Sequence, residues 1–162
     1  MHPRHYLVID LEATCDQPAS FPRSESEIIE IGAVLVESTH LQPVAEFQTF
    51  IQPVRHPRLT AFCTELTSIT QADVDFAPHF PEAIDALGRF LANYHPVLFC
   101  SWGAYDRNQL RHDAAHHRVR LPLGSRHLNL KQAFSDQLGT RKRYGMRGAL
   151  RRAGLPMDGT HH

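Results

Sequence analysis

Short apolar runs separated by polar stretches predict five strands along the chain. Tyr6-Leu7-Val8-Ile9 is continuous and apolar, which is typical of a strand buried on both faces. Residues 28–36 are apolar and β-branched, and residues 46–51 alternate between two faces, so both predict further strands. Prolines in residues 52–57 indicate a loop, because proline is excluded from a sheet interior. The last two strands are expected at residues 97–100 and 127–130.

Apolar positions at helical spacing predict the helices around these strands. Ile84, Leu87 and Leu91 recur in this way within residues 80–94. Further helices are expected at residues 60–66, from Thr70, from Asp106 to about residue 117, at 130–138 and at 144–153, with Gly154 as a C-cap. The order of elements predicts an α/β fold with a five-stranded mixed sheet, three antiparallel strands and then two parallel ones, flanked by helices.

Composition places the chain among ordinary globular proteins. Its 162 residues fit a single domain, expected to span residues 1–162. No apolar run approaches the ~20 residues of a membrane span, so no membrane partner is expected. The three cysteines are widely spaced and lack zinc-type pairing, which predicts reduced thiols and a cytoplasmic location.

The net charge of zero conceals a division between the two parts of the chain. Residues 1–106 carry 5 Lys and Arg against 14 Asp and Glu, whereas residues 107–162 carry 12 against 3. An acidic metal site and a basic rim would both suit a polyanionic substrate such as a nucleic acid. The alternative is that the basic residues lie on solvated helix faces.

The tripeptide Asp10-Leu11-Glu12 closes the first apolar run and carries the strongest chemical signal. Side chains alternate along a strand, so Asp10 and Glu12 are expected on one side, about 6.6 Å apart. Two carboxylates at that distance repel by about 2.5 kcal/mol at an effective dielectric constant near 20. The pair therefore predicts a divalent cation at the end of a central strand, with a solvated strand end as the alternative.

Asp106 is a third candidate ligand. It follows the strand at residues 97–100 and opens a helix, and ligand sites in α/β sheets gather beyond strand ends. Together with Asp10 and Glu12 it would form a cluster suited to Mg²⁺ or Mn²⁺. The alternative is a helix N-cap.

Four segments share their pattern with one known family: Asp10 to Cys15, Glu27 to Ala33, Phe62 to Gln71 and Ser101 to Leu110. They resemble the DEDDh 3′–5′ exonucleases, and among these the Eri-type group that includes enzymes trimming histone mRNA and small RNAs. Ser68 stands where this group usually has glycine. With Asn129-Leu130-Lys131 and residues 145–150, the resemblance spans nearly the whole chain.

The resemblance implies an RNase H-like fold and hydrolysis of phosphodiester bonds with two Mg²⁺ or Mn²⁺ ions. Asp10, Glu12 and Asp106 would be the metal ligands, and His162 the general base, with His161 as an alternative in register. The ordinary His pKa near 6.5 suits that role. The fourth carboxylate of the family is expected five residues beyond His162, at the start of a further helix, where this sequence has already ended. We therefore expect these 162 residues alone to be weakly active or inactive. The alternative interpretation of His161-His162 is the remnant of an affinity tag.

The resemblance also implies substrate contacts. Phe62 and Leu66 share one face of a short helix and would hold the terminal base, as Trp102 would. The backbone around Ala13 and Thr14 would contact the 3′-terminal sugar. Core packing is the alternative for the three apolar side chains.

The resemblance thus implies a metal-dependent 3′–5′ exonuclease that acts on single-stranded RNA or 3′ overhangs and releases nucleoside 5′-monophosphates. Two alternatives stay open. One is a nucleic-acid-binding module without catalysis, and the other is an exonuclease directed at DNA.

Overall fold

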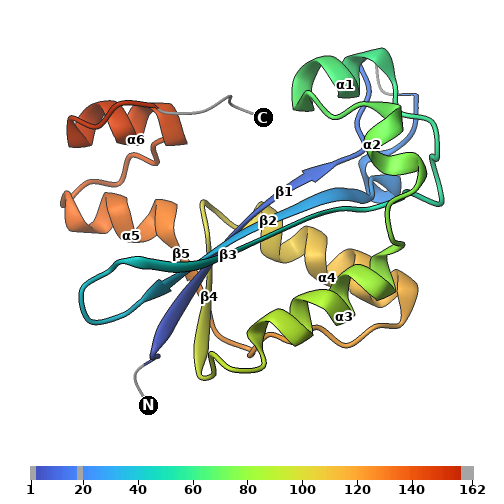
Figure 1. The fold of residues 1–162 in the computed structure, drawn as a ribbon. Coiled ribbons are helices and arrows are strands. Elements are labelled where there is room, and N and C mark those ends of the chain that lie inside the picture. The colour runs from blue at the N-terminus through green and yellow to red at the C-terminus, as the bar shows by residue number, and fades with distance from the viewer. Residues whose placement is uncertain (1–2, 18–19, 158–162) are drawn as a thin grey trace.

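A central sheet of five strands organises the molecule (Figure 1). The computed structural model describes residues 3–17 and 20–157. The strands lie in the order β3-β2-β1-β4-β5, so that β1 is central. Their bounds are β1 His5–Ala13, β2 Ile28–Glu37, β3 Pro43–Phe50, β4 Val97–Ser101 and β5 His127–Asn129.

The pairing pattern confirms the mixed sheet that the sequence predicts. β1, β2 and β3 are antiparallel neighbours, whereas β4 lies parallel to β1 and β5 parallel to β4. Short connections join antiparallel strands, while parallel neighbours need a longer crossover. The connection from β3 to β4 contains α1 Ala61–Thr67, α2 Gln71–Asp75 and α3 Phe80–Leu91, and the connection from β4 to β5 contains α4 Tyr105–His117. The short helix η1 Arg23–Glu25 lies between β1 and β2, and α5 Leu130–Gln137 and α6 Met146–Ala153 follow β5.

Local capping explains where several helices begin and end. The Thr60 hydroxyl accepts a hydrogen bond from the Cys63 amide at 3.0 Å, and Thr70 forms a capping box with Asp73. Gly154 ends α6 with φ at 70°, a left-handed conformation that favours glycine. The predicted Gly154 cap is therefore confirmed.

The first strand is longer than the apolar run suggests. β1 continues past Ile9 to Ala13 because its pairing with β2 extends to the end of the strand. Asp10 and Glu12 therefore lie among the last four residues of the central strand, at the end where the sequence predicts them. Leu11 and Ala13 between and after them are buried, which continues the alternation of the two faces.

The main core lies between the sheet and two helices. Leu7, Ile9 and Leu11 of β1 are buried in one apolar cluster with Leu87 of α3 and Leu110 of α4. Figure 1 shows α3 and α4 on one side of the sheet, α1 and α2 near the end of β1, and α5 and α6 beyond β5. In the described residues, no helix has the length and apolar character that a membrane span requires.

Replacing Leu87 with alanine should destabilise the protein by about 2–5 kcal/mol, because the substitution leaves a cavity in the main core. Urea denaturation measures this change. Phe76 is 97% exposed, so Phe76→Ala is the matched control and should shift the free energy of unfolding by less than about 0.5 kcal/mol. Equal effects of the two substitutions would contradict this description of the core.

Candidate active site

The strand pairing places Asp10 and Glu12 on one face of β1. Asp10 is exposed and lies opposite Gly32 of β2, which has no side chain. Glu12 is half-buried and lies opposite Glu30, so two carboxylates meet directly across the strands. Like charges in this arrangement are destabilising. The Glu30 carboxylate accepts a hydrogen bond from the Gln48 side chain at 2.8 Å.

Asp106 reaches the same region from α4. Its side chain is 5% exposed, and Gly103, with φ at 115°, forms the turn that leads from β4 into the helix. The N-cap of α4 is Ala104, so Asp106 lies inside the first turn. The N-cap interpretation of Asp106 is therefore wrong.

The three carboxylates influence one another. Burial and then the neighbouring charges, first that of Asp10, raise the pKa of Glu12 to about 7, and Asp106 contributes to this rise. Burial and then Asp10 raise the pKa of Asp106 to about 6. The three predicted ligands thus interact electrostatically. Asp10 raises the pKa of both Glu12 and Asp106, and Asp106 also raises the pKa of Glu12.

The donor chemistry of this group fits a hard divalent cation. Carboxylate oxygens are the ligands that Mg²⁺ and Mn²⁺ prefer, and a cation would relieve the repulsion among them. Within residues 3–17 and 20–157, no three His, Cys, Asp or Glu side chains are already arranged at metal-ligand spacing. The fit therefore rests on the chemistry and mutual repulsion of these carboxylates.

A cavity of about 610 Å³ adjoins Glu12. The end of β1, the segment after it, α1 and the start of α4 contribute its lining, which includes the predicted contacts Ala13, Thr14, Phe62 and Leu66. Leu66 is 51% exposed, which excludes the core-packing alternative for this residue. One cavity is therefore lined by four of the predicted substrate contacts, Ala13, Thr14, Phe62 and Leu66.

Trp102 is placed elsewhere. Its ring nitrogen donates a hydrogen bond to the Tyr144 carbonyl at 3.1 Å, and its ring centroid lies 5.9 Å from that of Phe134. It is not among the residues that line the cavity. The structure thus shows packing contacts for Trp102, and its expected contact with the base stays a prediction.

Thr14 connects the cavity to the start of β2. Its hydroxyl accepts a hydrogen bond from the Glu27 amide at 2.9 Å, and its own amide donates to the Glu27 carbonyl at 2.8 Å. The Ser26 hydroxyl donates to the Thr14 carbonyl. These bonds hold the wall of the cavity in place.

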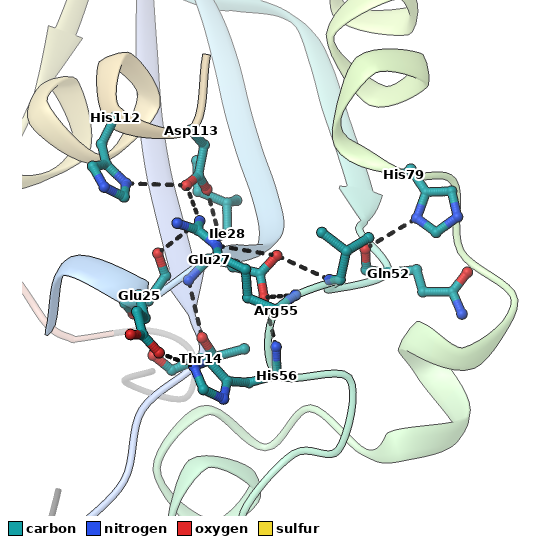
Figure 2. A network of polar contacts seen from close by, with 12 residues as sticks. Thr14, Glu25, Glu27, Ile28, Gln52, Arg55, His56, His79, His112 and Asp113 are labelled. Carbon is teal, nitrogen blue, oxygen red and sulfur yellow. Dashed lines mark hydrogen bonds and ion pairs between the residues drawn. The ribbon is translucent and has the colours of Figure 1, made fainter. Parts of the chain in front are cut away.

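A buried polar network supports this wall from behind (Figure 2). The Arg55 guanidinium donates to the Asp113 carboxylate at 2.7 Å, and Asp113 also accepts from the Ile28 amide at 2.8 Å. The Glu27 carboxylate accepts from the backbone amides of Val54, Arg55 and His56. The network therefore joins β2, the loop at residues 52–57 and α4.

Sequence reasoning missed several residues of the cavity, among them Phe21, Arg23, Tyr105 and Gln109. The first two lie in a segment without periodicity. Tyr105 is adjacent to Asp106, and burial followed by the charges of Asp106 and Glu12 raises its pKa to about 12. Tyr105 and Gln109 both lie in the segment Ser101 to Leu110 that carries the resemblance, and this was the available signal. His161 and His162 lie outside the described residues, so the assignment of a general base stays a prediction.

The family model described as RNase_T, Exonuclease, matches residues 7–162. The chain belongs to this exonuclease family. ERI1 exoribonuclease 3 of Mus musculus is 32% identical over 88% of this chain and 44% of the relative. The 3′-5′ exonuclease eri1 of Schizosaccharomyces pombe is 35% identical over 59% of this chain and 32% of the relative. The chain thus spans less than half the length of these relatives, and the Eri-type resemblance is confirmed.

Solved structures show the same fold. A full-length 3′-exonuclease superposes with a TM-score of 0.89 and 24% identity over 99% of this chain and 74% of its own. The nuclease domain of 3′hExo, a DEDDh family member bound to rAMP, gives a TM-score of 0.86 and 24% identity over 99% of this chain and 84% of its own. The RNase H-like fold expected from the sequence is therefore confirmed.

The raised pKa of Glu12 predicts that this exonuclease domain loses stability as pH rises. The folded chain holds the Glu12 proton more tightly than the unfolded chain, so this stabilisation is complete below about pH 4.5 and lost through about pH 7. In EDTA, Glu12→Gln should stabilise the protein at pH 8 by about 1–2 kcal/mol after solvent screening, and by less at pH 4. Thermal or urea unfolding at both pH values measures the difference.

Glu65→Gln, at an exposed position of α1, is the control and should show little dependence on pH. A gain for Glu12→Gln that is the same at pH 4 and pH 8 would argue against electrostatic coupling at Glu12.

Proposed function

We propose that this chain is a divalent-metal-dependent 3′–5′ exonuclease that acts on single-stranded RNA or 3′ overhangs and releases nucleoside 5′-monophosphates. The observation that carries the proposal is a group of three mutually repelling carboxylates beside a cavity with aromatic and aliphatic walls. Family membership supports the reaction class.

Asp10, Glu12 and Asp106 are the residues that would hold metal in this proposal. Exonucleases of this family generally use divalent metal ions, and we propose Mg²⁺ or Mn²⁺, two ions in the complete site. When bound, such ions activate the attacking water and stabilise the charge on the leaving oxygen. Asp106 extends from a helix fixed against the sheet, which keeps its carboxylate beside the β1 pair.

The cavity residues position the 3′ end of the substrate. Phe62 and Leu66 expose apolar surface on which a base can stack without a sequence requirement. Ala13 and Thr14 form the wall beside Glu12, where the terminal sugar would lie. In this proposal His162, or His161 in the alternative register, accepts the proton of the attacking water, which an imidazole with an ordinary pKa can do at neutral pH.

RNA is the substrate we favour. The relative of Mus musculus is named an exoribonuclease, and one similar solved structure is described as 3′-end recognition of a histone mRNA stem-loop by a 3′-exonuclease. Exonuclease I of E. coli, which shares the fold at 10% identity, was solved with a dA16 oligonucleotide. RNA and DNA oligonucleotides of one sequence separate these two substrates.

Asp106→Asn should reduce exonuclease activity by about 100-fold or more, because it removes one charged oxygen from the proposed metal site. The assay follows shortening of a 5′-labelled single-stranded RNA with Mg²⁺, Mn²⁺ or EDTA. Asp85→Asn, at an exposed position of α3, is the matched control and should retain activity.

Activity that persists in EDTA would contradict the proposed chemistry. Salt-dependent RNA binding without turnover, in this chain and in a longer gene product, would favour the non-catalytic binding module instead.

Phe62→Ala should raise the KM for a single-stranded RNA by about 5- to 100-fold with a smaller change in kcat, because base stacking contributes about 1–3 kcal/mol. Steady-state kinetics on a short oligonucleotide measures both constants. Phe76→Ala removes an aromatic ring of the same kind outside the cavity and should leave KM unchanged. A similar KM for both variants would exclude Phe62 from substrate binding.

A further inference from the structure

One cationic side chain lines the cavity beside the carboxylates. Among the described residues of the lining, Glu12 and Asp16 are acidic and Arg23 alone is basic. An acidic cavity repels a phosphodiester, so a cation on its wall changes what the cavity accepts. Arg23 lies in η1, outside the four segments that carry the resemblance to the exonuclease family.

Arg23 is available to a ligand, whereas Arg55 is not. Arg55 is largely buried and is engaged by Asp113 at 2.7 Å and Glu27 at 3.6 Å. Arg23 is exposed, and within the described part of the chain no carboxylate forms an ion pair with it. Its planar group of donors matches the oxygens of a phosphate.

Arg23 lines the same cavity as one of the proposed metal ligands. Glu12 and Arg23 are both in its lining, as is Tyr105, the residue before Asp106. The cation of Arg23 therefore faces the space that adjoins the proposed metal site.

Contacts on both sides of Arg23 fix the segment that carries it. Before it, the Phe21 ring stacks on His56 with centroids 3.9 Å apart and an angle of 16° between the planes. After it, the Glu25 carboxylate lies 2.9 Å from the same His56 ring (Figure 2). The Ser26 amide donates to the Arg23 carbonyl at 3.2 Å, and the Ser26 hydroxyl donates to Thr14. An ordered backbone lowers the entropy lost when the side chain binds a ligand.

We propose that Arg23 binds a phosphate group of the 3′-terminal nucleotide and thereby makes the acidic cavity selective for a nucleotide over a nucleoside. This inference rests on the proposed function, because it takes the 3′ end of a nucleic acid as the occupant of the cavity. His56 is a positioning residue in this arrangement, since it contacts both Phe21 and Glu25.

Equilibrium binding of mononucleotides tests the proposal without turnover. The 162-residue chain is titrated in Mg²⁺ with adenosine 5′-monophosphate, adenosine 3′-monophosphate and adenosine. The unmodified protein should bind one of the monophosphates at least about tenfold more tightly than adenosine. Arg23→Ala should reduce this preference about tenfold and leave the affinity for adenosine unchanged, whereas Arg23→Lys should retain part of it.

Arg89→Ala is the matched control, because Arg89 is an exposed residue of α3, outside the cavity. It should bind all three compounds like the unmodified protein. The monophosphate that loses affinity in Arg23→Ala identifies which phosphate, 5′ or 3′, the guanidinium contacts. An unmodified protein without preference for a monophosphate, or an unchanged preference in Arg23→Ala, would overturn the inference.

Salt dependence and catalysis separate this inference from the proposed function. For single-stranded RNA, Arg23→Ala should reduce the slope of log affinity against log salt by about 0.7, which corresponds to one phosphate contact. If the unmodified protein degrades RNA but Arg23→Ala has an unchanged nucleotide preference and salt slope, the inference fails and the function stands. If no RNA is degraded but the nucleotide preference depends on Arg23, the function fails and the inference stands.

Discussion

The buried contact between Arg55 and Asp113 determines how α4 lies against the sheet. Asp113 is 1% exposed and Glu27 is 3% exposed, so both need compensating donors in an environment of low dielectric constant. Arg55 and the backbone amides of residues 54–56 provide these donors. Asp113 lies seven residues after Asp106 on α4, about two helical turns away, so a fixed Asp113 also fixes the approach of Asp106 to β1.

The sheet also holds two carboxylates, those of Asp10 and Glu12, close together although their charges repel. Alternation along β1 sends the buried apolar residues to the side of α3 and α4 and the carboxylates to the other side. The free energy of apolar burial therefore holds Asp10 and Glu12 in place despite their repulsion. This separation explains how a central strand can carry two acidic residues.

Much of the fold follows from local patterns, whereas the site depends on contacts between distant residues. The period of two in β1 continues beyond the apolar run through Leu11 and Ala13, so the alternation that the sequence predicts for Asp10 and Glu12 follows from local pattern. Asp10, Glu12, Phe62 and Leu66 belong to motifs and were identified. Arg23 belongs to no periodic element, and its position depends on a contact between Phe21 and His56 that no local pattern encodes. Trp102 belongs to a motif as well, but its indole nitrogen donates a hydrogen bond to the carbonyl of Tyr144, 42 residues later in the chain, which no local pattern encodes.

The helix that carries Phe62 has its own small core, composed of Ile29, Cys63, Ile69 and Val74. This cluster is separate from the main one, and the Thr60 hydroxyl connects it to the chain by donating to the Cys15 carbonyl at 2.8 Å. Side chains on the exposed face of α1 can therefore be exchanged without repacking the sheet that carries the carboxylates. In evolutionary terms, the surface of α1 and the carboxylates of β1 can change independently in this scaffold, because they rest on separate apolar clusters.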